Sequence, residues 1–226
     1  MAPAMGKFVA SGLATSFIMI PAVVFGVLTG DLLGALTGRD PGLLGWALIA
    51  LGAFAFIAFG SATWGSSMSR ISSAGHEHGM ALGAAVGVAP VVVGVALSLT
   101  YFERLFVEQR QLPDVPIDNI YTLLFTSALA IVTGTAGFAL SVGAGQRATA
   151  PILAAQCALG GGLTFLAVNL TLDALGMRVG APGAEERLTM ITTTFLGSFA
   201  AGFIAGGIIG TGLRRQRMRL QPQAPG

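Results

Sequence analysis

An asparagine and a carboxylate interrupt one long apolar stretch of this sequence. Asn169 and Asp173 lie within GGGLTFLAVNLTLDALG, residues 160–176. Residues four apart share one face of a helix, so the two side chains would project in the same direction. A carboxylate at mid-bilayer costs ~2.5–3.5 kcal/mol and usually faces a cavity inside a helix bundle. If Asp173 instead ends the span at the membrane boundary, the cost is much smaller and no function is required.

Hydroxyl side chains occur at the same depth as this pair when the apolar stretches are aligned. Three of these residues fall in the outer half of the bilayer, as assigned from the charge pattern described below: Thr126, Ser127 and Thr193. We therefore expect Asn169, Asp173 and the three hydroxyl residues to form a candidate substrate-binding site in the outer half of a bundle. In the alternative interpretation, each hydroxyl bonds the carbonyl four residues earlier in its own helix.

The two histidines, His76 and His78, do not make a metal site by themselves. They lie in GHEHG, and the sequence contains no third histidine. A structural zinc site takes four ligands, and a helical histidine pair takes the i, i+4 spacing of H-E-x-x-H. The sequence also has no phosphate-binding loop and no Ser/His/Asp set for nucleophilic catalysis. We therefore expect neither a metal site nor an enzyme, and the sequence assigns no cofactor.

The composition indicates a membrane protein. The 226 residues are 54% hydrophobic and 10% charged, with a mean hydropathy of +0.78. This leaves too little polar surface to coat a soluble globule of the same size. The pI of about 9.2 reflects a net charge of only +2, so we expect no nucleic-acid partner.

Six stretches are long enough to cross a bilayer. A hydrocarbon core of ~30 Å takes about 20 apolar residues in a helix, which satisfies all of its own backbone hydrogen bonds. We therefore predict an all-α, polytopic integral membrane protein with one six-helix domain, residues 1–213, and a basic tail, residues 214–226. The predicted spans are 8–28, 43–63, 80–101, 121–144, 151–175 and 188–213.

Lysine and arginine are divided unequally between the two ends of these spans. Lys7, Arg70, Arg147 and the RRQRMR stretch at 214–219 fall at one end, where the loops contain a single acidic residue, Glu77. The cytoplasmic loops of membrane proteins carry such an excess of Lys and Arg. We therefore expect both termini in the cytoplasm and the bacterial cytoplasmic (inner) membrane as the location.

Small residues recur at every fourth position in the first, third, fifth and last of the spans. Such glycine-zipper stripes let helix backbones approach closely, where dispersion and Cα–H···O contacts operate. We expect the stripe of the last span to seat another helix, of this chain or of a partner. Pro90, inside the third span, is expected to kink it. The helix-packing residues are Ser198, Gly202, Gly206 and Gly210 in the last span and Gly83 and Gly87 in the third.

Two functions are compatible with this pattern. The first is a non-catalytic subunit of a larger membrane complex, docked through small-residue helix faces, because extramembrane mass and intramembrane charge are both low. The alternative is a small-solute transporter or channel that uses the polar residues of the outer half. The expected partners are the lipid bilayer and other membrane subunits or further copies of the chain.

Overall fold

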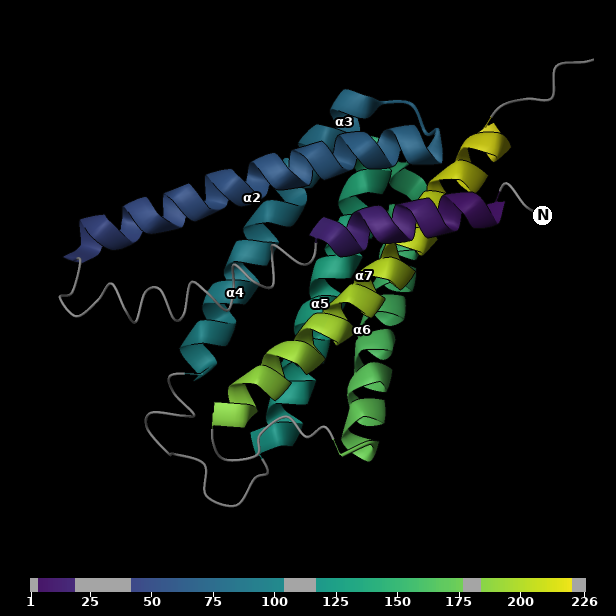
Figure 1. Cartoon of the computed structure of the whole chain (residues 1–226). Coiled ribbons are helices and arrows are strands. Elements are labelled where there is room, and N and C mark those ends of the chain that lie inside the picture. Colours follow the sequence, from purple (N-terminus) through teal and green to yellow (C-terminus); the bar gives the residue numbers. More distant parts are fainter. Residues whose placement is uncertain (1–3, 19–41, 104–116, 177–183, 221–226) are drawn as a thin grey trace, which may run out of the picture.

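The computed structural model describes residues 4–18, 42–103, 117–176 and 184–220. Helices are the only regular secondary structure in these residues, which confirms the all-α class (Figure 1). In chain order they are the N-terminal helix Ala4–Ile18, α2 Gly42–Ser72, α3 Glu77–Gly83, the π-helix η1 Ala84–Val88, α4 Ala89–Glu103, α5 Ile117–Gly143, the 3-10 turn η3 Arg147–Thr149, α6 Ala150–Ala174 and α7 Ala184–Leu220.

Four stretches of helix in the described residues are long and apolar enough to cross a membrane, as expected of an integral membrane protein. They correspond to the last four predicted spans. The first predicted span, 8–28, is described only to Ile18, and the second, 43–63, falls within α2. The count of six spans therefore stays a prediction. The four stretches are Glu77–Leu99, Thr122–Gly143, Arg147–Ala174 and Thr194–Met218.

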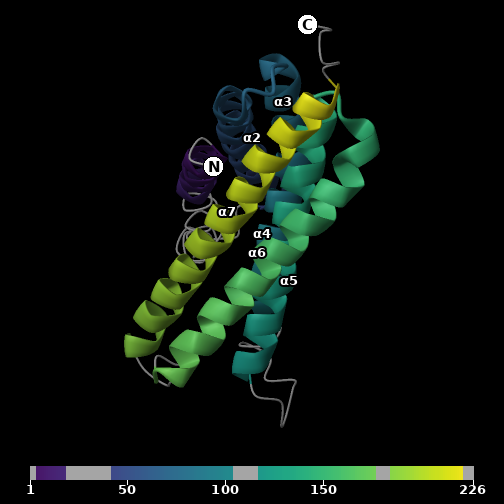
Figure 2. The same ribbon diagram turned by 90° about the vertical axis from the view of Figure 1, so that its right-hand side faces the viewer.

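Helices α5, α6 and α7 form the centre of the bundle. α5 and α6 run side by side in both views, and α7 packs across them (Figure 1, Figure 2). A Cβ atom built on Gly134 of α5 would lie 3.0 Å from the Cβ of Ala158 of α6, so the two backbones approach closely. Phe165 of α6 is buried between Leu129 of α5 and Ala201 of α7. The three helices therefore share one core.

The N-terminal helix and α2 cross this centre steeply (Figure 1). The N-terminal helix packs on α7 through edge-on aromatic pairs, Phe8 with Phe203 and Phe17 with Phe199, at ring centroid distances of 5.9 and 6.3 Å. Ser16 Oγ also donates a hydrogen bond of 2.7 Å to the carbonyl oxygen of Phe199. The phenylalanines of α7 thus flank a contact between two helices of the same chain.

The third predicted span is interrupted by a turn of π-helix. α3, η1 and α4 follow one another without a break, and Pro90 comes two residues after the end of η1. Proline has no backbone N–H, and its ring clashes with the carbonyl four residues earlier, here that of Val86 inside η1. A wider π turn relieves that clash, which explains why η1 precedes Pro90. The kink expected at Pro90 stays a prediction.

The segments with the excess of Lys and Arg come together at one end of the molecule. Lys7 Nζ donates a hydrogen bond of 2.6 Å to Ser73 Oγ, and the Arg217 guanidinium donates to the Ser73 carbonyl oxygen. Gln146, beside Arg147, donates to the carbonyl oxygen of Leu213 at 3.4 Å. Residues 214–220 of the predicted tail continue helix α7. The cytoplasmic placement of this end stays a prediction from the charge pattern.

Candidate functional site

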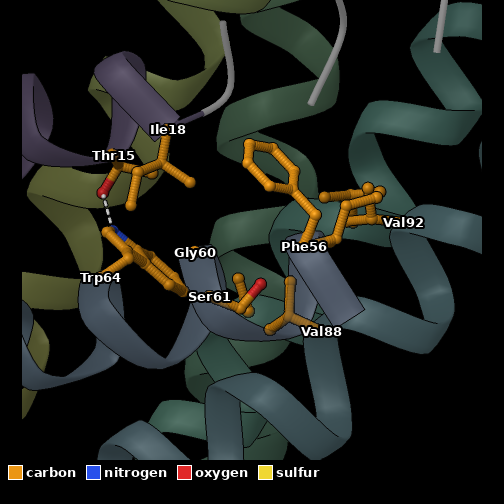
Figure 3. A pocket seen from close by; sticks show the side chains of 11 residues that line it. Thr15, Ile18, Phe56, Gly60, Ser61, Trp64, Val88 and Val92 are labelled. Atoms are coloured by element: carbon orange, nitrogen blue, oxygen red, sulfur yellow. Dashed lines mark hydrogen bonds between the residues drawn. The ribbon is translucent and has the colours of Figure 1, made fainter. Parts of the chain in front are cut away.

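A cleft of about 150 Å³ lies where the N-terminal helix, α2, the η1–α4 segment and α5 meet (Figure 3). Apolar side chains make up most of its wall. The lining residues are Thr15 and Ile18 of the N-terminal helix, Phe56, Ile57, Gly60, Ser61 and Trp64 of α2, Val88 of η1, Val92 of α4, and Val132 and Ala136 of α5.

Helical spacing brings these side chains to the cleft. Ile57, Ser61 and Trp64 recur at intervals of four and three along α2, which places them on one face of that helix. Each is buried. Gly60 lies beside them without a side chain, and nothing comes within 4 Å of the position that its Cβ would take. Part of the cleft therefore exists because α2 has a glycine at this position.

The polar groups of the cleft are largely engaged with one another. Trp64 Nε1 donates a hydrogen bond of 3.1 Å to Thr15 Oγ1, as Figure 3 shows. Thr15 Oγ1 in turn donates to the Ser11 carbonyl oxygen at 2.9 Å and lies 3.9 Å from Met68 Sδ. The Ser61 hydroxyl is the further polar group of the lining. A ligand would therefore meet apolar surface and few free hydrogen-bonding groups.

The cleft has no means of binding a charged group. None of the described residues that line it is ionisable. Transfer of a charge into an apolar site without a partner costs far more free energy than one hydroxyl returns. The arrangement can therefore hold an aromatic ring or an alkyl segment, with at most a hydroxyl or carbonyl group directed toward Ser61.

The π-helical turn contributes to one wall of the cleft. Val88, the last residue of η1, and Val92, one turn later in α4, both line it. π-helical turns occur frequently at functional sites, because the wider turn displaces side chains from regular helical register. The wall of the cleft is therefore built where the third span departs from α-helix.

Four of the five residues predicted as a polar site have side chains that the structure describes, and none of the four lines this cleft. Asn169 is buried, its Nδ2 donates to the Phe165 carbonyl oxygen at 2.9 Å, and it packs on Gly197 of α7. Asp173, one turn later, is exposed next to the end of α6. The structure therefore places these two residues in different surroundings although they share a helix face.

The hydroxyl residues of the predicted site also differ from one another. Thr126 is half-buried, and its Oγ1 is enclosed without a hydrogen-bond partner. Ser127 is exposed, and the side chain of Thr193 lies outside the described residues. Among the described hydroxyls, that of Thr171 bonds the carbonyl oxygen of Ala167 in its own helix, at 2.7 Å, as the alternative interpretation expects.

The histidine segment lies at the basic end of the molecule. His76 and His78 are exposed, and Glu77 between them pairs with Arg70 at 2.5 Å and accepts a hydrogen bond of 2.5 Å from Ser66. No group of three or more potential metal ligands occurs in the residues that the structure describes. Glu77 is therefore engaged in fixing the turn between α2 and α3.

The small-residue stripe of α7 lies against the N-terminal helix. A Cβ atom on Gly206 would overlap Thr15, and one on Gly210 would overlap Ser11. Ser198 and Gly202, earlier in the stripe, are buried as well. The stripe therefore faces a helix of the same chain along these two positions.

The glycines of the third span face α5. A Cβ atom on Gly83 would lie 2.7 Å from the carbonyl oxygen of Ala139, and one on Gly87 would lie 2.8 Å from the Cβ of the same residue. This second stripe is also occupied by a helix of the chain itself.

Sequence reasoning missed the cleft residues. Phe56, Ile57, Val88 and Val132 are of the same apolar types that face lipid elsewhere, so residue type alone gives no signal. The available signal was Trp64: a tryptophan near Thr63 and Ser66, at the end of an apolar stretch, needs a hydrogen-bond partner for its N–H when buried.

No protein-family model, curated protein or solved structure matches this chain. Its function is therefore inferred from its own geometry.

Proposed function

We propose that the chain is a membrane transporter for a small amphiphilic solute whose apolar part binds in the cleft. The observation that carries this proposal is the cleft itself, walled by four helical segments and bounded on one side by the Thr15–Trp64 hydrogen bond. Ligand sites commonly combine a mostly apolar wall with a few oriented polar groups. Here the Ser61 hydroxyl and the Thr15–Trp64 pair are those groups.

The size of the cleft limits the solute. A dry apolar cavity of roughly 150 Å³ holds a benzene-sized molecule, and the cleft has about this volume. One aromatic ring or a short alkyl segment therefore fills it. Wholly apolar molecules of this size cross lipid unaided, so the solute of a transporter must also carry a polar part, which the cleft leaves outside.

Opening of the cleft would require the N-terminal helix to move, because this helix forms one of its walls. It contributes Thr15 and Ile18 to the cleft, and its hydrogen bond to Trp64 adds a net stabilisation of only about 0.5–1.5 kcal/mol. Separation of Thr15 from Trp64 would widen the cleft, at the cost of this bond and of the contacts that the N-terminal helix makes with α7. Movement of this helix would then expose the bound solute first to one side of the membrane and then to the other.

Binding can be tested through Trp64. In a Trp46→Phe background Trp64 is the sole tryptophan, since the sequence contains two. A bromophenol, whose bromine quenches tryptophan fluorescence, is titrated into the protein in lipid nanodiscs. We expect saturable quenching. Purely linear quenching, equal to that of free tryptophan in the same nanodiscs, would show partition into lipid without a site.

A matched pair of variants localises the binding. Gly60→Leu fills the cleft, and Gly52→Leu adds the same side chain to α2 at an exposed position; a Cβ at either site meets nothing within 4 Å. Both changes also gain up to about 1 kcal/mol of helix propensity. We expect Gly60→Leu alone to abolish saturable quenching and solute-dependent permeability of proteoliposomes. Equal behaviour of the two variants would place the site elsewhere.

A second candidate function is the non-catalytic subunit of a membrane complex. The observation that favours it is the position of α2, whose N-terminal half extends past the other helices (Figure 1). Leu51, Phe54 and Phe59 on this helix are exposed. The small-residue stripes face helices of the same chain, so a partner would dock on α2 instead. Co-purification of other membrane proteins at fixed stoichiometry, lost in Phe59→Ser, would support this function.

For the membrane arrangement we keep six spans with both termini in the cytoplasm, in a bacterial inner membrane. The convergence of Lys7 and Arg217 on Ser73 supports one part of this proposal, because the first described helix begins and the last one ends at the same end of the bundle. A chain that crosses the membrane an even number of times begins and ends on the same side.

A further inference from the structure

Two cations from opposite ends of the chain meet at one residue. Lys7 of the N-terminal helix donates to Ser73 Oγ at 2.6 Å, and Arg217 of α7 donates to the Ser73 carbonyl oxygen. Lys7 is half-buried, while Arg217 and Ser73 are exposed. Ser73 holds φ at +56°, a left-handed conformation that is uncommon for serine and that ends α2 beside the two side chains.

No carboxylate that the structure describes at this end is available to balance the two charges. Glu77 is already paired with Arg70 at 2.5 Å. The remaining acidic residues of the described ranges lie near the opposite ends of their helices, at Glu103, Asp118, Asp173, Glu185 and Glu186. The C-terminal end of α2 offers Lys7 and Arg217 only about half of one negative charge.

Each cation also has donors left over. The Lys7 ammonium has three N–H groups and the Arg217 guanidinium has five, and the contacts to Ser73 occupy only part of them. An anion with several oxygen atoms would satisfy these donors and remove the repulsion between the two charges. A phosphate group has that geometry.

Exposed methionines occur close to both cations in the sequence. Met5, two residues before Lys7, is 73% exposed, and Met218, directly after Arg217, is 56% exposed. Exposed apolar side chains at the same end of the molecule suit a ligand that has a phosphate and a hydrocarbon part better than a free phosphate ion. Arg217 lies at the end of one of the four described helices that are long and apolar enough to cross a membrane, which is the level of lipid headgroups.

We propose that Lys7, Ser73 and Arg217 form a binding site for the phosphate of an anionic phospholipid headgroup. Bound lipid would hold the N-terminal helix and the end of α7 against the α2–α3 turn. This inference does not depend on the cleft or on transport.

The test uses the full chain in detergent, titrated with a short-chain, water-soluble phosphatidylglycerol and followed by thermal unfolding. The matching phosphatidylcholine is the zwitterionic control, and glycerol phosphate is the probe for a site that needs only the phosphate. We expect stabilisation by phosphatidylglycerol at concentrations where the other two have no effect. Equal effects of phosphatidylglycerol and glycerol phosphate, or of the two lipids, would overturn the proposal.

Charge-removing variants separate this site from general attraction by the basic end. The double variant Lys7→Gln with Arg217→Gln should bind phosphatidylglycerol roughly thirtyfold more weakly, from about fivefold per basic residue. The double variant Arg147→Gln with Arg215→Gln removes the same charge from two other exposed residues at this end. It should bind almost as tightly as the natural chain. Equal weakening in both double variants would mean that no defined site exists.

The folding of the variants is checked without lipid. Both double variants should unfold at similar temperatures in the absence of phospholipid, because the substituted side chains lie at the surface or are half-buried. If Lys7→Gln with Arg217→Gln unfolds early, the single variant Arg217→Gln replaces it, because Arg217 is exposed. Its expected weakening is roughly fivefold, and unchanged binding would contradict the assignment.

Discussion

Gly79 of α3 and Gly143 of α5 face each other with their backbones in contact. A Cβ atom on either glycine would overlap the carbonyl oxygen of the other. This reciprocal arrangement brings each Cα–H group to the opposite carbonyl, a weak hydrogen bond that recurs at close helix crossings. The contact joins the start of the third span to the end of the fourth. Both glycines lie next to the turns at the basic end.

We expect Gly143→Ala to destabilise the chain. The added methyl group meets a backbone that belongs to another helix and cannot move like a side chain, and overpacking of this kind costs about 1–3 kcal/mol. Alanine would by itself stabilise a helix by up to about 1 kcal/mol relative to glycine. A decrease in stability would therefore indicate that the two backbones are in contact, whereas an increase would reflect helix propensity alone. Thermal unfolding in detergent measures it.

Gly52→Ala is the control for Gly143→Ala. Nothing lies within 4 Å of the position of a Cβ atom on Gly52, so only helix propensity changes there. Gly52→Ala should stabilise or leave the chain unchanged. If Gly143→Ala behaves in the same way, α3 and α5 do not pack as closely as described.

A second prediction concerns the stripe of α7. Gly206→Leu should separate the N-terminal helix from α7, because a Cβ atom there already overlaps Thr15 and the Ser11 carbonyl oxygen. We expect a loss of at least about 1–3 kcal/mol in the free energy of unfolding and faster proteolysis of the N-terminal helix. Gly94→Leu, at an exposed glycine of α4 with no atom within 4 Å of its Cβ, should do neither.

The helices could be predicted from sequence because lipid leaves an apolar segment of sufficient length little alternative to helix. The same argument located the last four spans. The relative exposure of residues on one helix face could not be predicted. Asn169 and Asp173 are four residues apart, yet Asn169 meets Gly197 of α7 and Asp173 lies one residue before the end of α6. Burial depends on where the neighbouring helix passes.

The cleft could not be predicted for a related reason. In a membrane protein, apolar side chains face both lipid and the interior, so Val88, which is buried in the wall of the cleft, and Val86, which is 65% exposed, look alike in the sequence. Gly60 gave no sign either, since most glycines in the described residues lie in close helix contacts. Only the packing of the four helical segments against one another shows which residues line the cleft.

A third prediction concerns topology. Ala148 and Ala174 lie near opposite ends of α6, and both are exposed. In a Cys157→Ala background, Ala174→Cys should react with an impermeant maleimide added outside intact cells, whereas Ala148→Cys should react only after the membrane is opened. The expectation follows from the excess of Lys and Arg at the end that contains Ala148. The reverse labelling pattern would invert the proposed orientation.

The last prediction concerns the hydrogen bond at the cleft. Thr15→Val keeps the shape of the side chain but removes the oxygen that accepts from Trp64 Nε1. Trp64 is 3% exposed, so its N–H would be left buried without a partner, at a cost of about 1–3 kcal/mol. In the Trp46→Phe background, the emission of Trp64 should shift, because the polar neighbour of its indole ring is gone.

A double-mutant cycle separates this bond from the two side chains. Trp64→Phe combined with Thr15→Val should cost less than the sum of the single changes, with a coupling of about 0.5–1.5 kcal/mol. Thr63→Val is the control: Thr63 is exposed on α2 and bonds only the Phe59 carbonyl oxygen, at 2.9 Å, so its loss should change stability by no more than about 0.5 kcal/mol. If Thr15→Val leaves both stability and Trp64 emission unchanged, the N-terminal helix does not close the cleft through this bond, and another contact must hold that wall.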